Sequence, residues 1–423
     1  MGKVFTHILV FLVCLTVAFS CKPTSTVRKN EQLYKQNNID IEVNYVICHE
    51  NDSVSRLYYS INNSELTYKK AQEDSLFTAE LHLFYKISAD ANAKQFLDTA
   101  TVVIKDRQKA VAKGRITGSR LFKATEGSKL FMELELKDIN RKALNNSQLY
   151  CNKLSKLGSQ NYLLKLTDSS VVYTSYIKQG STIAFKNKRV NNQKAYVQYA
   201  ALEQKLPPPP FSVKEIPASV VKFDSAFSLN RSSNDWFSLN IEKQGCYFMS
   251  VDSMSKQGCA LYSFDESFPR VTSHTQMIES IRYITTKDEY DELMEAQDKQ
   301  QAIEKFWIGI GGNMDRARGL IKKYYGRVQD ANTQFSSDKE GWRTDRGMIY
   351  VIFGSPAYVY QTEAVETWVY GEIGTPNALR FEFKHVNSQF SDNAFELERN
   401  VFFKDPWYLA VDAWREGRVY LDN

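Results

Sequence analysis

Two carboxylates and a histidine in the last third of the chain have residue types and a spacing that could do chemistry. Asp345, Glu366 and His385 could act as acid and base around a cleft, because paired carboxylates support hydrolysis when their surroundings push their pKa values apart. The substrate would be a glycan or a cell-wall polymer. The sequence supplies no nucleophile elbow, phosphate-binding loop or metal-ligand spacing beside them. We therefore expect a structural role for these residues, and no enzyme, metal or cofactor.

The residues around Asp345 favour a tight turn. Gly341 and Gly347 flank it, and glycine tolerates the positive φ angles that other residues resist. Thr344 and Asp345 are suited to accept backbone N–H bonds within the turn. The two arginines of the turn can pair with Asp345 or with the acidic residues at and near Glu366, which would fix the turn against the strand expected after it.

Two tryptophans near these carboxylates have two interpretations. Trp342 and Trp368 each bring a large apolar ring with one N–H group to satisfy. As buried residues they would hold a fold together. As exposed residues they would be stacking platforms for a sugar, and the protein would bind glycans.

The first twenty residues have the layout of a secretory leader. Lys3 is followed by an apolar run from Ile8 to Phe19 and a small residue before Cys21. The run is too short to span a bilayer comfortably. Cys21 resembles the acceptor of a bacterial lipoprotein box, and buried acyl chains contribute ~0.8 kcal/mol per CH₂ to anchoring. The alternative is an ordinary cleaved signal in which Cys21 is incidental.

Residues 21–37 are expected to form a polar tether without an acidic cluster. In Bacteroidetes-type lipoproteins, an acidic cluster directly after the cysteine marks export to the cell surface. Its absence favours the outer membrane with a periplasm-facing position, and Lys22 in place of Asp gives no inner-membrane retention signal. The resemblance thus implies a protein held at the membrane by its lipid.

Four further cysteines follow Cys21 in the chain. Cys246 and Cys259 flank a plausible hairpin and could form a disulfide across it in an oxidising periplasm. The alternative is four free thiols, with Cys48 and Cys151, that are buried as small hydrophobic residues. The spacing does not resemble a zinc site.

A short pattern of Asp, then Ser or Thr, then an apolar residue occurs at five places. It resembles the O-glycosylation acceptor of exported Bacteroidetes proteins, and a sugar there would solubilise a surface turn. Three residues match easily by chance, so we expect some sites to be silent. The candidate acceptors are Ser53, Ser75, Thr99, Ser225 and Ser253.

The composition limits the class of protein. A length of 423 residues indicates about three domains at roughly 150 residues each. Apolar residues make up 43% and charged residues 24%, which excludes a disordered chain and a multi-span membrane protein. The net charge is +5 and the basic residues are spread along the chain, which argues against nucleic acid as a partner.

Alternation of apolar and polar residues, as from Ile39 to Ile47, is typical of strands with one buried face. Such runs predict two antiparallel β-sandwich domains over residues 38–110 and 111–205. The prolines from Pro207 to Pro210 predict a stiff linker over residues 206–211 that separates domains. Further short strands predict a small β-rich domain over residues 212–275.

After residue 276, the spacing of the apolar residues becomes that of helices. Thr286 and Glu289 form a capping box, and an apolar stripe from Ala317 to Phe335 predicts a second helix. Strands are expected again at Met348 to Phe353, Thr367 to Tyr370, Leu379 to Val386 and Phe395 to Phe403. The predicted fold class is mainly β plus α+β: tandem antiparallel β-sandwich domains followed by a C-terminal α+β domain over residues 276–423.

One segment is specific enough to indicate a family. Residues 341–347 read Gly-Trp-Arg-Thr-Asp-Arg-Gly and resemble the signature of the GWxTD-domain family of bacterial, Bacteroidetes-type envelope lipoproteins. The resemblance covers roughly residues 286–421. The chain departs from the family at Ile308 to Gly312, where members often have an Arg-Asp-Pro stretch. The signature residues in this chain are Gly341, Trp342, Thr344, Asp345, Arg346, Gly347 and Trp368.

The family resemblance implies an envelope protein with β-rich modules before the named domain, without an established chemistry. We therefore expect a non-enzymatic interaction or assembly module, anchored by lipid in the outer membrane and facing the periplasm. Its β domains would hold the C-terminal domain at a distance, where it binds a protein of the outer membrane or periplasm. The alternatives are a carboxylate-dependent hydrolase of cell-wall or glycan polymers, and a glycan-binding lipoprotein.

Overall fold

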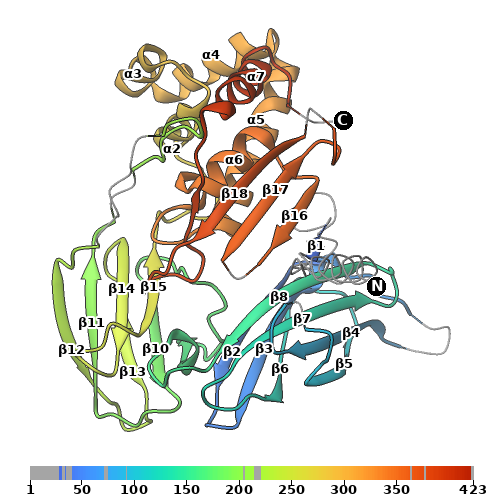
Figure 1. Ribbon diagram of the computed structural model, residues 1–423, viewed down its shortest axis with the longest axis vertical. Coiled ribbons are helices and arrows are strands. Elements are labelled where there is room, and N and C mark those ends of the chain that lie inside the picture. The colour runs from blue at the N-terminus through green and yellow to red at the C-terminus, as the bar shows by residue number, and fades with distance from the viewer. Residues whose placement is uncertain are drawn as a thin grey trace, which may run out of the picture.

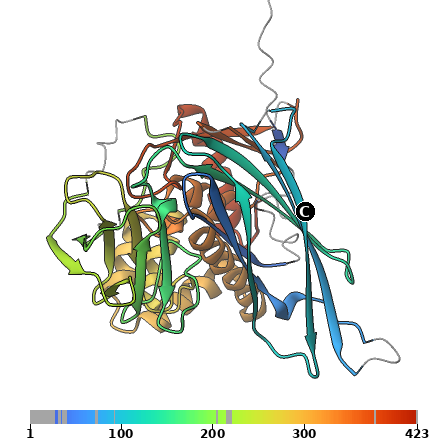
Figure 2. The same ribbon diagram turned by 90° about the horizontal axis from the view of Figure 1, so that it is seen from below.

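The computed structural model describes residues 28–30, 34, 41–70, 75–91, 93–202, 205–213, 221–362, 364–375 and 378–420. They form two β-sandwiches side by side and an α+β unit that lies against both (Figures 1 and 2). The strand pairs of the five sheets are antiparallel. The predicted fold class, β-sandwiches followed by a C-terminal α+β unit, is confirmed.

The first sandwich contains two sheets around one core. Their strands, in spatial order, are β2 (Val43–His49), β3 (Val54–Asn62) and β6 (Arg115–Lys123), facing β5 (Asp98–Gln108), β4 (Phe77–Ser88), β7 (Lys129–Asp138) and β8 (Leu144–Asn152). The shared core includes Leu57, Leu83 and Leu134. The predicted division at residue 110 is therefore wrong. Alternation identifies a strand but not its partners, and β6, β7 and β8 complete sheets that earlier strands begin.

The second sandwich spans the predicted proline linker. One sheet has β13 (Phe237–Asn240), β10 (Thr182–Asn187) and β9 (Tyr162–Leu166), and the other has β12 (Ser225–Asn230), β11 (Lys194–Ala200), β14 (Gly245–Ser250) and β15 (Cys259–Ser263). Because strands from both sides of the prolines share one core, the separate small domain predicted over residues 212–275 does not exist. The prolines lie within a connection between β11 and β12.

The proline segment instead packs against the C-terminal unit. The Pro208 carbonyl accepts a bond of 3.2 Å from the Arg399 guanidinium, and the Pro210 carbonyl accepts one of 3.1 Å from the Asn400 amide. Phe211 packs against the C-terminal core. The stiff segment thus joins two units where the sequence predicted that it would separate them.

The C-terminal unit places helices against a five-stranded sheet (Figure 1). Its helices are α2 (His274–Ser280), α3 (Lys287–Glu295), α4 (Lys299–Gly311), α5 (Met314–Phe335), α6 (Asp345–Phe353) and α7 (Lys404–Arg415). The sheet has the order β1 (Arg28–Asn30), β16 (Tyr358–Gln361), β17 (Val365–Tyr370), β18 (Leu379–His385) and β19 (Phe395–Leu397). The capping box at Thr286 and the stripe of α5 are confirmed.

The segment from Met348 to Phe353 is helical, so its prediction as a strand was wrong. Every residue of α6 is buried, because the helix lies at the centre of the unit in contact with α5, α7 and the sheet. A helix that is buried all round shows no amphipathic period and cannot be told from a buried strand by its apolar run. The predicted strand from Phe395 to Phe403 is also shorter, since β19 ends at Leu397 and α7 soon follows.

The N-terminal strand belongs to the C-terminal sheet. β1 pairs with β16 in the register Arg28 with Gln361 and Asn30 with Val359. Residues 28–30, in the middle of the predicted tether, are thus paired with the edge of the α+β unit. None of the helices within the described ranges has the length and hydropathy of a membrane span.

Candidate functional site

The signature turn is a helix start built on two close backbone contacts. Thr344 caps α6, because its hydroxyl accepts a bond of 3.1 Å from the Gly347 amide and donates one of 2.7 Å to the Gly341 carbonyl. A Cβ on Gly341 would lie 1.8 Å from the Ala331 carbonyl oxygen, and one on Gly347 would lie 1.9 Å from that of Gly341. Neither glycine has a positive φ angle. Glycine is therefore required here for close approach, and the predicted positive φ is wrong.

Asp345 is fully engaged inside the unit. Its carboxylate accepts a bond of 2.8 Å from the Leu397 amide and forms a two-pronged ion pair with the Arg399 guanidinium. Both charged side chains are only 7% exposed. Such forked pairs are strong and geometrically specific. Asp345 therefore joins the start of α6 to the segment after β19, which leaves it badly placed as an acid or a base.

Glu366 lies at 0% exposure on β17 and receives four donors. The Trp368 indole N–H donates over 2.6 Å, Gln361 over 3.2 Å, Tyr34 over 3.2 Å and Arg346 over 3.4 Å. A buried carboxylate is costly unless it is paired and hydrogen-bonded. These donors satisfy it, and the predicted pairing of Arg346 with Glu366 is present.

The arginines of the signature turn hold neighbouring elements. Arg343 donates to Glu340 over 2.8 Å and to Glu279 on α2 over 2.7 Å, and its guanidinium lies 4.2 Å from the Trp342 ring centroid. Arg346 also donates to the Asn393 carbonyl over 3.0 Å. Each arginine thus ties the start of α6 to a segment distant in the sequence.

The two tryptophans are buried, at 2% exposure for Trp342 and 0% for Trp368. Trp342 donates its indole N–H to Glu340 over 3.0 Å. Trp368 packs against Phe383 with ring centroids 4.8 Å apart. The interpretation of these rings as stacking platforms for a sugar is therefore contradicted, and they belong to the core.

The three candidate catalytic residues each have a different partner. His385 is partly exposed, and its Nε2 lies 3.2 Å from the Asp392 carbonyl. Asp345 and Glu366 are each bound by a different arginine. Among the described residues, no group of three or more His, Cys, Asp or Glu side chains could hold a metal ion.

Tyr34 is a site residue that sequence reasoning missed, as it also missed Arg399. Tyr34 lies in the predicted tether, yet its ring packs against Phe335 and Trp368 with centroids 5.0 and 5.4 Å away. Burial raises the pKa of Tyr34 well above its usual range, so its hydroxyl keeps the proton that it donates to Glu366. A lone aromatic residue in a polar stretch was the only available signal.

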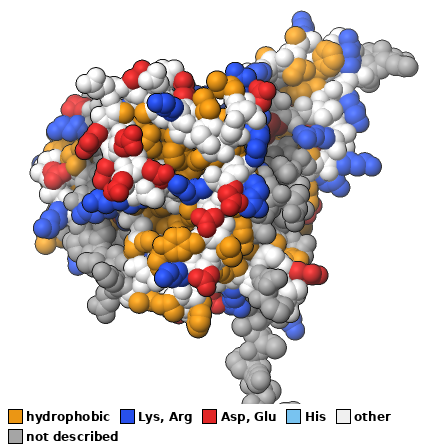
Figure 3. Space-filling view, turned by 90° about the horizontal axis from the view of Figure 1, so that it is seen from above, with side chains coloured by type: hydrophobic (Ala, Val, Ile, Leu, Met, Phe, Trp, Pro, Cys, Tyr) orange, Lys and Arg blue, Asp and Glu red, His pale blue; other side chains and the backbone are white. Residues whose placement is uncertain are grey.

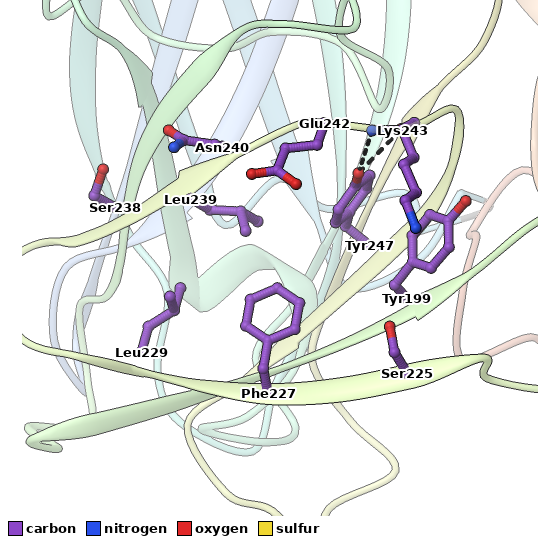
Figure 4. Close-up of a pocket in the computed structure, with 10 residues that line it drawn as sticks. All are labelled: Tyr199, Ser225, Phe227, Leu229, Ser238, Leu239, Asn240, Glu242, Lys243 and Tyr247. Carbon is purple, nitrogen blue, oxygen red and sulfur yellow. Dashed lines mark hydrogen bonds between the residues drawn. The ribbon is translucent and has the colours of Figure 1, made fainter.

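A pocket of about 300 Å³ lies in the second sandwich, between β12 and β13. Figure 4 shows the ring of Phe227 and the side chain of Leu229 rising from β12 toward Leu239 and Glu242. Phe227 is 42% exposed. The residues that line the pocket lie outside the signature and include none of the predicted catalytic residues.

The cysteines of the described residues are free thiols. The predicted hairpin of β14 and β15 forms, but its register places Cys246 opposite Tyr262 and Cys259 opposite Met249. The predicted disulfide is therefore wrong, because the two side chains do not face each other, and the free-thiol alternative holds. Burial raises the pKa of each of the four thiols, to about 11 or 12.

The predicted glycan acceptors Ser53, Ser75, Thr99, Ser225 and Ser253 are all exposed. Thr99 lies within β5, as expected. Their modification stays a prediction. Cys21 lies outside the described residues, so its lipidation is likewise untested.

Residues 245–416 match the family model of the GWxTD domain. The match begins at the first residue of β14 and so extends into the second sandwich. The resemblance to this domain is confirmed. A search of curated proteins finds no match.

Two solved structures of Bacteroides uniformis beta-glucuronidase 2 show a weak similarity. One is a calcium-binding mutant, at 12% identity, and the other is covalently bound to cyclophellitol-6-carboxylate aziridine, at 13% identity. Each alignment covers 39% of this chain, with a TM-score of 0.19. This chain spans 17% and 16% of those chains. Such scores support no argument about fold or function.

Proposed function

We propose that the protein is a lipid-anchored, periplasm-facing protein of the outer membrane and a non-enzymatic interaction or assembly module of the cell envelope. The observation that carries this proposal is that the two carboxylates at the signature are bound by other residues of the protein. Asp345 and Glu366 are bound by arginines and other donors in the core, so the signature maintains a shape. A maintained shape without reactive groups suits a binding module.

An exposed apolar face supplies a surface for the partner protein. Val401, Phe402, Tyr408 and Leu409 lie around the start of α7 with exposures of 56%, 82%, 48% and 63%. Exposed apolar groups that cluster on a surface often mark interaction sites. Hydrophobic side chains also gather in several patches on the face seen from above (Figure 3).

The anchor and the C-terminal unit lie close together under this proposal. Six residues lie between Cys21 and Arg28 of β1, and the seven residue-to-residue steps span at most roughly 25 Å. A lipid on Cys21 would therefore hold the α+β unit near the membrane. The earlier expectation, that the β domains hold this unit at a distance, does not fit the pairing of β1 with β16.

Co-purification after solubilisation of membranes tests this function. We expect a stoichiometric barrel or periplasmic protein with the wild type, and its loss when Phe402 and Leu409 are both replaced by Asp. Met254→Asp is the matched control, because Met254 is 88% exposed on a turn of the second sandwich. A wild-type chain that purifies alone would contradict the proposal. Cys21→Ser should abolish lipidation and membrane fractionation.

Glycan binding is the second candidate, at the pocket in Figure 4. The partly exposed Phe227 ring beside Asn240 and Glu242 offers an apolar face with polar groups at its rim, which is the usual composition of a small-ligand site. Glycan-array binding that disappears with Phe227→Ala and persists with Met254→Asp would favour it. Absence of binding by the wild type would exclude it.

A further inference from the structure

β1 and Tyr34, near the N-terminus, contact residues of the C-terminal unit that match the GWxTD domain. β1 adds a short antiparallel strand to the edge of β16, with Lys29 opposite Tyr360. Four residues after β1, the Tyr34 ring lies edge-on to Phe335, at an interplanar angle of 70°, and tilted against Trp368. β1 and Tyr34 therefore make two kinds of contact, backbone pairing along an edge and a side chain among buried aromatic rings.

Polar groups fix both ends of Tyr34. Its hydroxyl donates to Glu366 over 3.2 Å. Its backbone carbonyl accepts bonds from the Ser355 hydroxyl over 2.6 Å and from the Tyr350 hydroxyl over 3.4 Å. Tyr34 has a φ angle of 68°, a left-handed conformation that is unfavourable for a residue other than glycine. The surrounding contacts must outweigh this strain.

The pocket and the residue inside it come from different parts of the chain. The groups that contact Tyr34 all lie within residues 245–416, which match the GWxTD domain. Trp368 is itself a signature residue, and Glu366 is bound by another, Arg346. Tyr34 lies far outside the matched residues. The matched residues thus supply the pocket, and a residue from a distant part of the chain fills it.

We propose that the edge of β16 and the Tyr34 pocket form a groove that binds a peptide segment carrying a tyrosine, with β1 and Tyr34 of this chain as its built-in ligand. Strand addition gives affinity that does not depend on sequence, and a side-chain pocket gives specificity. This inference rests on the proposed function, because it assigns the recognition chemistry of the interaction module. A partner with such a segment would displace the built-in one.

The groove should distinguish tyrosine from phenylalanine. A phenyl ring would fill the space between Phe335 and Trp368, but it would leave Glu366 without one of its four donors. A hydrogen bond to a charged group contributes enough that a peptide with Phe in this place should bind roughly tenfold or more weakly.

The test uses the mature chain with Tyr34→Ala, which empties the pocket, and a fluorescent peptide of residues 26–38. We expect anisotropy to show micromolar binding to this variant and none to the wild type, whose own segment is present at a high effective concentration. The peptide with Ala in place of the tyrosine is the control. Failure of the peptide to bind, or equal binding of the control peptide, would overturn the proposal.

A second measurement does not depend on the folding of the Tyr34→Ala chain. Lys29→Cys with Tyr360→Cys should form a disulfide, because residues opposite each other in a ladder have Cβ atoms about 5 Å apart. Lys29→Cys with Glu382→Cys is the control, since Glu382 lies two strands further from β1 than Tyr360. Absence of the first cross-link would overturn the proposal. The proposed function is tested separately, by whether the co-purified partner is lost when Phe402 and Leu409 are both replaced by Asp.

Discussion

Two regions of the molecule bury charged groups and satisfy them in opposite ways. Around the signature turn, each buried charge meets an opposite one, as Arg346 meets Glu366 and Arg399 meets Asp345. At the junction of the two sandwiches, Lys153 is 0% exposed and donates to the Val54 and Ala124 carbonyls over 3.0 and 2.7 Å. Its partners there are neutral oxygens.

The junction also buries a histidine. His49 is 0% exposed, with Nδ1 2.9 Å from the Ser55 hydroxyl and Nε2 2.9 Å from the Asn152 carbonyl. Burial lowers the pKa of His49 to about 4. Ion pairs surround this core, because Arg189 bonds Asp52 and Glu126 over 2.7 and 3.0 Å.

This difference predicts what destabilises each region. Removing one partner of a buried ion pair leaves an uncompensated charge, so the signature region is sensitive to mutation. The junction instead depends on His49 staying neutral, so it is sensitive to protons. The sequence signature marks the first region, whereas the second carries no motif.

Gly341→Ala should strongly destabilise the signature side. The added Cβ would lie 1.8 Å from the Ala331 carbonyl oxygen, so backbone must move, and we expect a loss of about 4 kcal/mol in the free energy of unfolding. Tryptophan fluorescence in urea reports this unit, since five of the six tryptophans follow residue 300. The control is Gly309→Ala on α4, where a Cβ meets nothing within 4 Å. Equal stability of the two variants would contradict the close-contact argument.

Acid should weaken the sandwich junction through His49. The folded pKa of about 4 lies below the ordinary 6.5, so the unfolded chain binds the proton more tightly. Stability therefore falls as the pH drops from 6.5 to about 4, by roughly 3 kcal/mol from this group. Urea unfolding followed by circular dichroism measures it, and the wild type should lose more than His49→Gln across that window. Parallel pH profiles for the two proteins would refute this origin.

Lys153→Met should have a smaller effect. It removes the bonds to two carbonyls and to the Ser55 hydroxyl, but it also removes a costly buried ammonium. We expect a net loss of about 1 kcal/mol in the free energy of unfolding. Lys205→Met, at an exposed position, is the control and should change little. A loss above about 3 kcal/mol in the free energy of unfolding would contradict this account, because it would mean that the ammonium of Lys153 stabilises the fold strongly.

A thiol reductant should have the smallest effect. The four cysteines after Cys21 are free thiols, so dithiothreitol should leave the melting temperature unchanged. Mass spectrometry after alkylation of the denatured chain should find all four modified without prior reduction. A melting temperature that falls with reductant would contradict this and would support the disulfide between Cys246 and Cys259.

The sequence predicted elements better than their assembly. Apolar runs and caps located β17, β18, α3 and α5, since these patterns are local. It misplaced the domain boundaries, because which strands share a core depends on pairing between distant segments. The strand predicted at Met348 to Phe353 failed because α6 is buried on every side and so shows no period.

The sequence predicted which residues make up the candidate site better than it predicted their contacts. The pairing of Arg346 with Glu366 was anticipated, whereas the partner of Asp345 proved to be Arg399, 54 residues away. The role of Gly341 was misjudged, since close approach to α5 is a tertiary property. Tyr34 was missed because no local pattern links it to a pocket more than 300 residues later.

The unfolding of Asp345→Asn and Glu366→Gln, followed by tryptophan fluorescence, tests most directly whether the signature maintains a shape. Each change leaves an arginine without its buried partner, so we expect each to cost about 3–5 kcal/mol in the free energy of unfolding. Stability close to that of the wild type would instead indicate carboxylates kept for a reaction, and would contradict a non-enzymatic binding module.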